Sequence, residues 1–239
     1  INGKKKELSY RLAEGDLVEL YLNDEFFEEG SLDFLKSRDT LSIVYEDENI
    51  CLVNKPAGMV VHEDETQRVH TLISNLQRYL YEKGEYKPQQ EHSFAPALCN
   101  RIDRNTSGLV IAAKNAATLR VMNEKLKNRE IKKKYLCVTH GRLTPSAGEW
   151  TAYHRKSESE KRVYLYDSPR SDTKTIVTKY RVLRQTDRYS LVEVDLITGR
   201  THQIRAHFAY MGYPLVGDGK YGRLSPDSPY RHQLLSSYK

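Results

Sequence analysis

The chain has 239 residues, enough for one domain with a substantial hydrophobic core and a small appendage. Its 38 Lys and Arg residues outnumber 32 Asp and Glu, and the net charge of +6 favours polyanionic partners. Three isolated cysteines without C-x-x-C spacing argue against a disulfide framework and a zinc site, and no apolar stretch approaches the length of a membrane span. Composition therefore favours a cytoplasmic protein without membrane or metal partners.

The chain opens with short alternating strand patterns around a basic turn, in INGKKKELSYRLAEGDLVELYL. This stretch is too short to fold alone. The mixed, acidic segment that follows contains a Gly-Ser break and is typical of a linker. We therefore expect residues 1–25 to be an appendage, residues 26–40 a linker and residues 41–239 the main domain.

The main domain begins with two strand-like runs, LSIVYED and NICLVNKP, which predict a hairpin. Apolar residues at helical spacing predict amphipathic helices around residues 72–80 and 119–126, both expected to support the core. Further strands are predicted in SGLVIAAK, KKYLCVTHG, RVYLY, TIVTKYRVL and SLVEVDLI. Because strands outnumber helices and do not alternate regularly with them, the predicted fold is α+β, with a mostly antiparallel or mixed sheet.

A first polar segment, N-R-I-D-R-N-T-S-G at residues 100–108, directly precedes the apolar strand LVIAA. If its start is extended, Arg101 and Asp103 project to the same side and Ile102 points inward. Asn105 to Gly108 have the composition of a turn. The residues alone leave two interpretations open, an ordinary turn and a functional site at a strand end.

A second segment, L-I-T-G-R-T-H-Q-I-R-A-H, is followed by a Gly and a Pro that stop a helix. A helix over residues 201–211 would bury Ile204, Phe208 and Met211 and leave Arg205 at the border of the core. A guanidinium there suits pairing with a carboxylate, although a solvated basic helix is the commoner outcome.

Neither a metal site nor a phosphate loop is predicted near this helix. His202 and His207 are five residues apart and fall on different helix faces, unlike the i, i+4 pair of a zinc helix. Gly217-Asp218-Gly219 lacks the spacing of a phosphate-binding loop.

A third segment runs from three lysines, residues 132–134, into a strand that carries Tyr135. Cations beside an aromatic ring suit phosphate contact next to base stacking. Alternatively, the lysines keep a strand end soluble.

These three segments, together with VNKPAGMVVH at 53–62 and GYPLVGDGKYG at 212–222, resemble the RluA-like RNA pseudouridine synthases of the large-subunit ribosomal RNA type, over Leu41 to the end. The family motifs typically read H-R-L-D-x-x-T-S-G and T-G-R-x-H-Q-[IL]-R-x-H. Five ordered motifs are far more specific than one. The resemblance implies the pseudouridine synthase fold, a central mixed, largely antiparallel sheet flanked by helices with an RNA-binding cleft. It also implies that residues 1–25 are the remnant of an alpha-L type RNA-binding domain.

The resemblance also implies roles for individual side chains. Asp103 matches the catalytic carboxylate, Arg205 its ion-pair partner, and Tyr135 the active-site tyrosine that packs against the target base. Arg101 matches the residue that holds the flipped nucleotide out of the stack. The remaining substrate-binding residues implied are Ile204, Arg200 and Asn100. Because Asn100 replaces the usual His, we expect altered local hydrogen bonding and retained activity.

The implied reaction isomerises specific uridines in structured RNA and needs no cofactor, because substrate and product contain the same atoms. Asp103 either attacks the anomeric carbon or assists loss of the 2′ proton, and the sequence does not choose between them. Ribosomal 23S RNA is the expected substrate, transfer RNA the alternative, and a monomer the expected state. Two rival hypotheses are a catalytically silent RNA-binding protein and a nucleoside hydrolase or glycosidase, which usually needs a second carboxylate or a metal.

Overall fold

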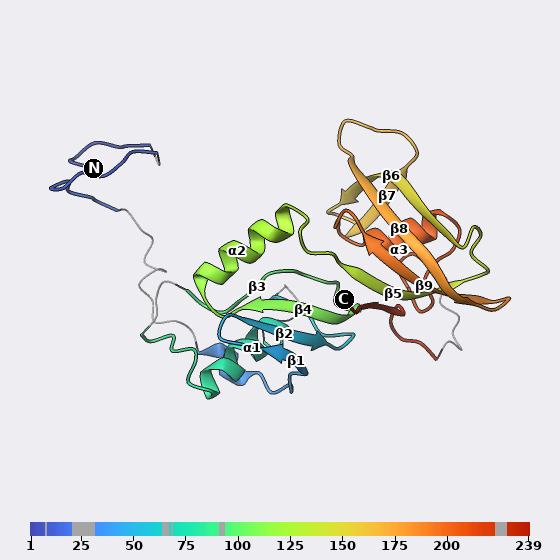
Figure 1. Cartoon of the computed structure of the whole chain (residues 1–239), viewed down its shortest axis with the longest axis horizontal. Helices are drawn as coiled ribbons and strands as arrows, with labels where there is room; N and C mark the ends of the chain where they lie inside the picture. Colours follow the sequence, from blue (N-terminus) through green and yellow to red (C-terminus); the bar gives the residue numbers. More distant parts are fainter. Residues whose placement is uncertain (8, 21–31, 64–66, 68, 91–93, 223–228) are drawn as a thin grey trace.

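The computed structural model describes residues 1–7, 9–20, 32–63, 67, 69–90, 94–222 and 229–239. Within them, ten strands form one sheet in the order β1-β2-β4-β10-β5-β9-β8-β6-β7, with β3 paired to β4 (Figure 1). Every pairing is antiparallel except that of β10 with β4. The sheet is therefore mixed and largely antiparallel, which confirms the predicted α+β fold.

The elements have the following bounds. The strands are β1 (Ile43–Glu46), β2 (Ile50–Lys55), β3 (Ala97–Leu98), β4 (Ser107–Ala113), β5 (Lys134–His140), β6 (Ala147–Ser157), β7 (Arg162–Tyr166), β8 (Lys174–Gln185), β9 (Tyr189–Leu196) and β10 (Leu235–Ser237). The helices are α1 (Leu72–Glu82), α2 (Ala116–Lys127), α3 (Gln203–Tyr210) and the short 3-10 helix η2 (Asp33–Lys36). The predicted hairpin, both central helices and the five further strands are present, whereas β3, β6 and β10 were not predicted.

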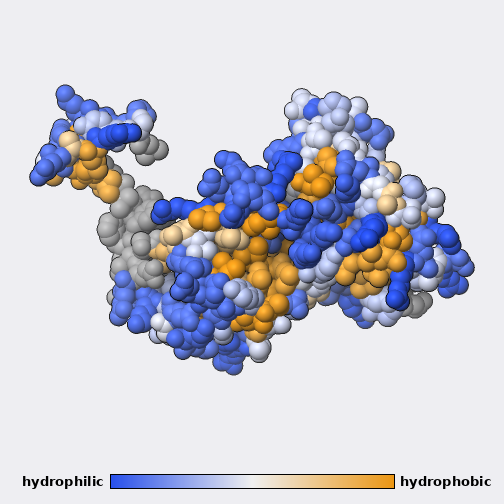
Figure 2. All heavy atoms as spheres, viewed as in Figure 1, coloured by the Kyte–Doolittle hydropathy of each residue, from blue (hydrophilic) through white to orange (hydrophobic). Residues whose placement is uncertain are grey.

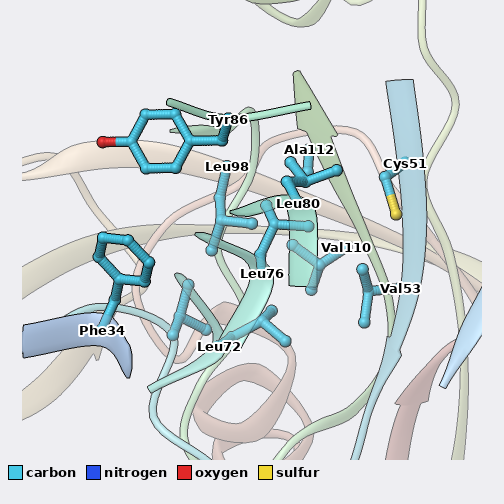
Figure 3. Packing of buried hydrophobic residues seen from close by; sticks show 11 residues of the cluster. Phe34, Cys51, Val53, Leu72, Leu76, Leu80, Tyr86, Leu98, Val110 and Ala112 are labelled. Carbon is cyan, nitrogen blue, oxygen red and sulfur yellow. The ribbon is translucent and has the colours of Figure 1, made fainter. Parts of the chain in front are cut away.

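The first half of the sheet, β1-β2-β4, packs against α1. A capping box between Thr71 and Ser74 starts the helix. From there Leu72, Leu76 and Leu80 point into a core with residues of β2 and β4 (Figure 3). This core explains the strong helical periodicity of the segment, because one face of α1 is fully buried.

This first core also includes Phe34, from the segment expected to be a linker (Figure 3). Its ring lies edge-on to Tyr81, with ring centroids 5.7 Å apart. The packed body therefore includes residues before the expected boundary at Leu41, while 26–31 lie outside the described residues. Residues 1–7 and 9–20 contain no strand, and their described hydrogen bonds are all internal to this segment.

The second half of the sheet, β5-β9-β8-β6-β7, packs against α3. Ile204 and Phe208 are buried in its core, as predicted for a helix starting near Thr201. Met211 was predicted to be buried, but it is 40% exposed. The helix ends at Tyr210, so Met211 lies in the turn that follows and leaves the buried face.

Helix α2 supports the core less than expected, since none of its residues is buried. Leu119, Met122 and Leu126 are half-buried on the side facing the sheet. Figure 2 shows apolar surface below α2 and hydrophilic surface on its outer side. Its last turn instead borders the cleft described below, through Leu126.

Strand β10 joins the two halves of the sheet. It pairs parallel with β4 and antiparallel with β5, near the C-terminus in the middle of the molecule (Figure 1). Gly108 allows this approach, because a Cβ atom there would lie 2.0 Å from the Ser237 carbonyl oxygen and the φ angle is +109°. Both halves thus meet through one three-residue strand.

Candidate active site

A cleft of about 1,220 Å³ crosses the joint between the two halves. One wall is built from the β3–β4 loop, and the other from β5, α3 and the loop that follows α3. The described lining contains only two acidic residues, Glu63 and Asp103. Its basic residues are Arg101, Arg104, Lys133, Lys156, Arg162, Arg200, Arg205, Lys220 and Arg231. Such an excess of positive charge attracts a polyanion and focuses its field in the cleft.

The loop that carries Asp103 is held by backbone hydrogen bonds and by one buried lysine. Thr106 N donates to the Asp103 carbonyl at 3.0 Å. The turn therefore spans residues 103–106, two residues earlier than predicted, because Ser107 and Gly108 already belong to β4. The ammonium group of Lys55 is fully buried and donates to the carbonyl oxygens of Pro56, Met59 and Arg104 at 2.8–2.9 Å. Three carbonyls match the three N–H groups of a protonated amine, so Lys55 ties this loop to the end of β2.

Asp103 is paired with Arg205, as the motifs predicted. Arg205 Nη1 donates to Asp103 Oδ2 at 2.9 Å, and 102 residues of chain separate the two. The Asp103 side chain is 25% exposed, whereas that of Arg205 is 9% exposed. The carboxylate therefore faces the cleft, and the guanidinium supports it from inside the protein.

Arg205 is itself held by Asp218, a carboxylate that the sequence did not identify as part of the site. Arg205 Nε and Nη2 donate to the two oxygens of Asp218 at 2.7 and 3.0 Å, and the Asp218 side chain is 0% exposed. Burial raises the pKa of Asp218, but hydrogen bonds from Arg205 and from the backbone N–H groups of Lys220 and Tyr221 bring it below its ordinary value. Burial also disfavours the charged form of Arg205 and so lowers its pKa, but the two carboxylates raise this pKa above its ordinary value. The result is a charged triad with a fixed, planar guanidinium at its centre.

The position of Asp218 depends on a close backbone approach. Leu234 N donates to the Val216 carbonyl at 2.8 Å, so the loop runs beside the C-terminal segment. A Cβ atom on Gly217 would lie 2.1 Å from the His232 carbonyl oxygen. The glycine before Asp218 is therefore required for packing.

Tyr135 and Ile204 form an apolar part of the cleft wall next to the triad. Both line the cleft and are buried, with 6% and 4% exposure. Burial raises the pKa of Tyr135 to about 12, and the charge of Asp103 contributes in the same direction. The phenol is therefore neutral at physiological pH, suited to pack against a base and to donate a hydrogen bond.

The other predicted substrate-binding residues also line the cleft. Arg101 and Arg200 are exposed at its surface, and Asn100 is half-buried. Asn100 Oδ1 accepts a hydrogen bond from the backbone N–H of Ile111 at 2.8 Å. The Asn100 side chain thus extends the β3–β4 ladder and helps to hold the loop that leads to Asp103.

We expect an Asn100→Ala variant to lose stability more than activity. The truncation leaves the Ile111 N–H without its acceptor, which costs about 1–3 kcal/mol. Urea denaturation checks the free energy of unfolding, and single-turnover kinetics on RNA check the rate. Asn100→Asp keeps an acceptor oxygen and serves as the matched control. A rate that falls strongly at unchanged stability would assign this residue to the chemistry instead.

Among the described residues no helix is long and apolar enough to cross a membrane. The described part of the chain contains no group of three or more His, Cys, Asp or Glu side chains that could hold a metal ion. Cys51, Cys99 and Cys137 are not paired in disulfides.

Comparison with known proteins places this site in a family. Residues 49–210 match the family model of RNA pseudouridylate synthases. An uncharacterized RNA pseudouridine synthase of Bacillus subtilis, YlyB, is 34% identical over 222 residues, which cover 93% of this chain and 70% of that protein. Ribosomal large subunit pseudouridine synthase C of Rickettsia bellii is 32% identical over 245 residues, covering 96% and 76%. The corresponding synthase D of Borreliella burgdorferi is 32% identical over 218 residues, covering 90% of this chain and 65% of that protein.

A solved structure agrees with these relatives. The human RNA pseudouridylate synthase domain containing 1 superposes with a TM-score of 0.67 at 26% identity, covering 88% of this chain and 79% of that one. The sheet, the cleft and the Asp103–Arg205 pair thus occur in a chain whose relatives share one activity. The protein belongs to the RNA pseudouridine synthase family and is an enzyme that isomerises uridine in RNA.

Proposed function

We propose that this enzyme modifies large-subunit ribosomal RNA and that Asp103 is its catalytic carboxylate. The names of the Rickettsia and Borreliella relatives support the choice of RNA. The observation that carries the proposal for Asp103 is its position. It is the carboxylate that Arg205 presents to a basic cleft while the rest of the triad stays buried. The proposal also takes the protein as a cytoplasmic monomer and residues 1–25 as part of an alpha-L type RNA-binding domain.

The proposed chemistry uses only the two oxygens of Asp103. Oδ2 is occupied by Arg205, and no described residue donates a hydrogen bond to Oδ1. Oδ1 is thus the oxygen that meets the ribose, either by attack on the anomeric carbon or by uptake of the 2′ proton. In both routes the bond to uracil N1 breaks and the base turns over. C5 then bonds to the anomeric carbon, either as the bond from Asp103 to that carbon breaks or as Asp103 returns the proton to C2′. The C5 proton is then released and N1 gains one, so no cofactor is consumed.

Tyr135 and Ile204 supply the surface on which the detached base is held. The neutral phenol of Tyr135 and the Ile204 side chain exclude water from one side of the pocket. Arg101 at the cleft surface is suited to fill the gap left in the RNA stack, since base flipping costs a few kcal/mol.

The triad itself offers no second carboxylate for hydrolysis. A glycosidase needs a second carboxylate to activate water. The neighbouring carboxylate here, Asp218, is fully buried and bonded to Arg205 and to two backbone N–H groups. It therefore cannot reach a water molecule in the cleft.

The experiment that tests the proposal uses RNA labelled with tritium at uridine C5. Pseudouridine formation releases the label, and large-subunit rRNA from cells lacking the enzyme is expected to be the preferred substrate over transfer RNA. Release from transfer RNA alone would overturn the choice of RNA. Free uracil as the product would support the hydrolase, and binding without release by the wild type would support a catalytically silent RNA-binding protein.

We expect a Lys133→Gln and Arg200→Gln double variant to bind RNA more weakly and with a reduced salt dependence. Both cations line the cleft, and half-buried Lys133 has no described acidic partner. If each contacts one phosphate, the slope of log K against log salt falls by about 0.7–0.9 per residue. Binding measured at several salt concentrations checks this. The matched control is Lys179→Gln with Arg184→Gln on β8, exposed residues outside the cleft lining. An unchanged slope would exclude both as phosphate contacts.

A further inference from the structure

Two side chains beside Asp103 take no part in the mechanism above. His202 Nε2 lies 3.9 Å from Asp103 Oδ2, and His202 Nδ1 lies 2.9 Å from the hydroxyl of Tyr221. That hydroxyl accepts a hydrogen bond from the backbone N–H of Val163 at 2.9 Å. The three groups form a chain that starts on β7 and ends at the catalytic carboxylate.

The direction of the hydrogen bonds in this chain follows from its two ends. The Val163 N–H can only donate, so the Tyr221 oxygen accepts from it and its own proton is free to reach His202 Nδ1. At the other end, Nε2 faces a carboxylate, and a lone pair there would be repelled. Nε2 therefore carries the ring proton and directs it at Asp103.

The surroundings hold both rings in place. His202 has a φ angle of +52°, a left-handed conformation uncommon for residues other than glycine, at the N-terminal end of α3. The guanidinium groups of Arg162 and Arg205 lie over the Tyr221 ring, 5.1 and 5.4 Å from its centroid. His154 Nε2 lies 3.0 Å from the Thr201 carbonyl, which anchors the residue before His202 to β6.

We propose that His202, oriented by Tyr221, is a positioning residue for Asp103. Together with Arg205 it holds Oδ2 and leaves Oδ1 as the oxygen presented to the ribose. This inference rests on the proposed role of Asp103 and names the groups that set its orientation. The 3.9 Å separation shortens to a hydrogen bond when the nucleotide displaces water from the cleft.

The charges around His202 favour its neutral form. Burial lowers its pKa, Arg205 and Lys220 act in the same direction, and Asp103 and Asp218 oppose them without reversing the shift. The O–H of Tyr221 donates to Nδ1, which only a neutral ring accepts. A neutral imidazole donates one hydrogen bond to Asp103 without neutralising the charge that the reaction needs.

The test compares wild type, His202→Asn, Tyr221→Phe and the double variant on the same RNA. Asparagine is chosen because it tolerates the left-handed conformation. His202→Asn is expected to lower kcat by up to roughly a hundred-fold with little change in KM, the effect of a misplaced reacting group. Tyr164→Phe on β7, whose hydroxyl bonds Glu160 at the surface, is the matched control. Urea denaturation of each variant separates loss of fold from loss of rate.

The pH profile distinguishes positioning from simple packing. Without the Tyr221 hydroxyl the neutral ring loses its donor, so the pKa of His202 rises and imidazolium forms at higher pH. The acid limb of kcat in Tyr221→Phe should therefore move to higher pH, and this movement should disappear in the double variant. In ¹⁵N-histidine spectra, wild type should show His202 as the Nε2–H tautomer.

Two results would overturn the inference in an active wild type. One is a His202→Asn variant with the kcat of wild type at every pH. The other is an acid limb that moves equally in Tyr221→Phe and in the double variant. An inactive wild type would instead reject the proposed role of Asp103, so the two failures are distinguishable.

Discussion

An Asp103→Asn variant is expected to lose pseudouridine formation, with the rate falling by roughly 10²–10⁴-fold or more. The amide cannot attack the anomeric carbon or take up a proton, whichever route the enzyme follows. Its oxygen still accepts from Arg205, and Asp218 still balances the charge of that residue. Stability should change little, and removing a negative charge from a basic cleft should not weaken RNA binding. Tritium release, a binding titration and urea denaturation measure the three quantities.

The matched control for this variant is Asp187→Asn, an exposed aspartate in the turn between β8 and β9. It makes the same chemical change outside the cleft and should retain full activity. If Asp103→Asn released tritium at the wild-type rate, Asp103 would not be the catalytic carboxylate. If both variants were inactive, the assay and not the site would be at fault.

Arg205→Met is expected to destabilise the protein by about 3–5 kcal/mol and to abolish activity. It leaves the fully buried Asp218 carboxylate without its partner and frees Asp103 from its support. Stability and activity can be separated with Arg205→Met, Asp218→Asn. In that double variant no unpaired charge is buried, and the amide oxygen still accepts from the backbone N–H groups of Lys220 and Tyr221. The free energy of unfolding should then recover substantially.

Activity should not recover with stability in the double variant, because Asp103 still lacks Arg205. Urea denaturation of the two single variants and the double variant gives the coupling energy, and tritium release gives the rate. If the double variant were less stable than Arg205→Met alone, Asp218 would stabilise the fold mainly through contacts other than its ion pair with Arg205. A double variant with wild-type activity would remove Arg205 from the mechanism.

The sequence predicted residues that line the middle of the cleft but not the residues that hold them in place. Asp103, Tyr135 and Arg205 lie in ordered motifs, and the structure brings all three to one cleft. Asp218 and Lys55 lie in two further motifs that the sequence also marked. However, no local sequence pattern predicts that Asp218 is fully buried against Arg205, or that Lys55 donates hydrogen bonds to three backbone carbonyls. Such roles depend on contacts between distant segments.

The fold was predictable wherever burial is one-sided and long enough to repeat. Helix α1 and strands β4, β5 and β9 follow this rule, with alternating or helical burial along their length. Strand β6 was missed because none of its first five residues is buried and they show no regular alternation of apolar and polar side chains. Strand β10 was missed because three residues are too few for a pattern.

The joint made by β10 has a consequence for the order of assembly. Ser107 and Leu235 meet across 128 residues, and Asp103 and Arg205 across 102. Contacts between residues this far apart in sequence form slowly, because the intervening segment loses conformational entropy before the contacts stabilise the fold. The joint between the two halves cannot form until β10 pairs with both β4 and β5. The enzyme should therefore gain its active site only after β10 has joined the two halves, in a late step of folding.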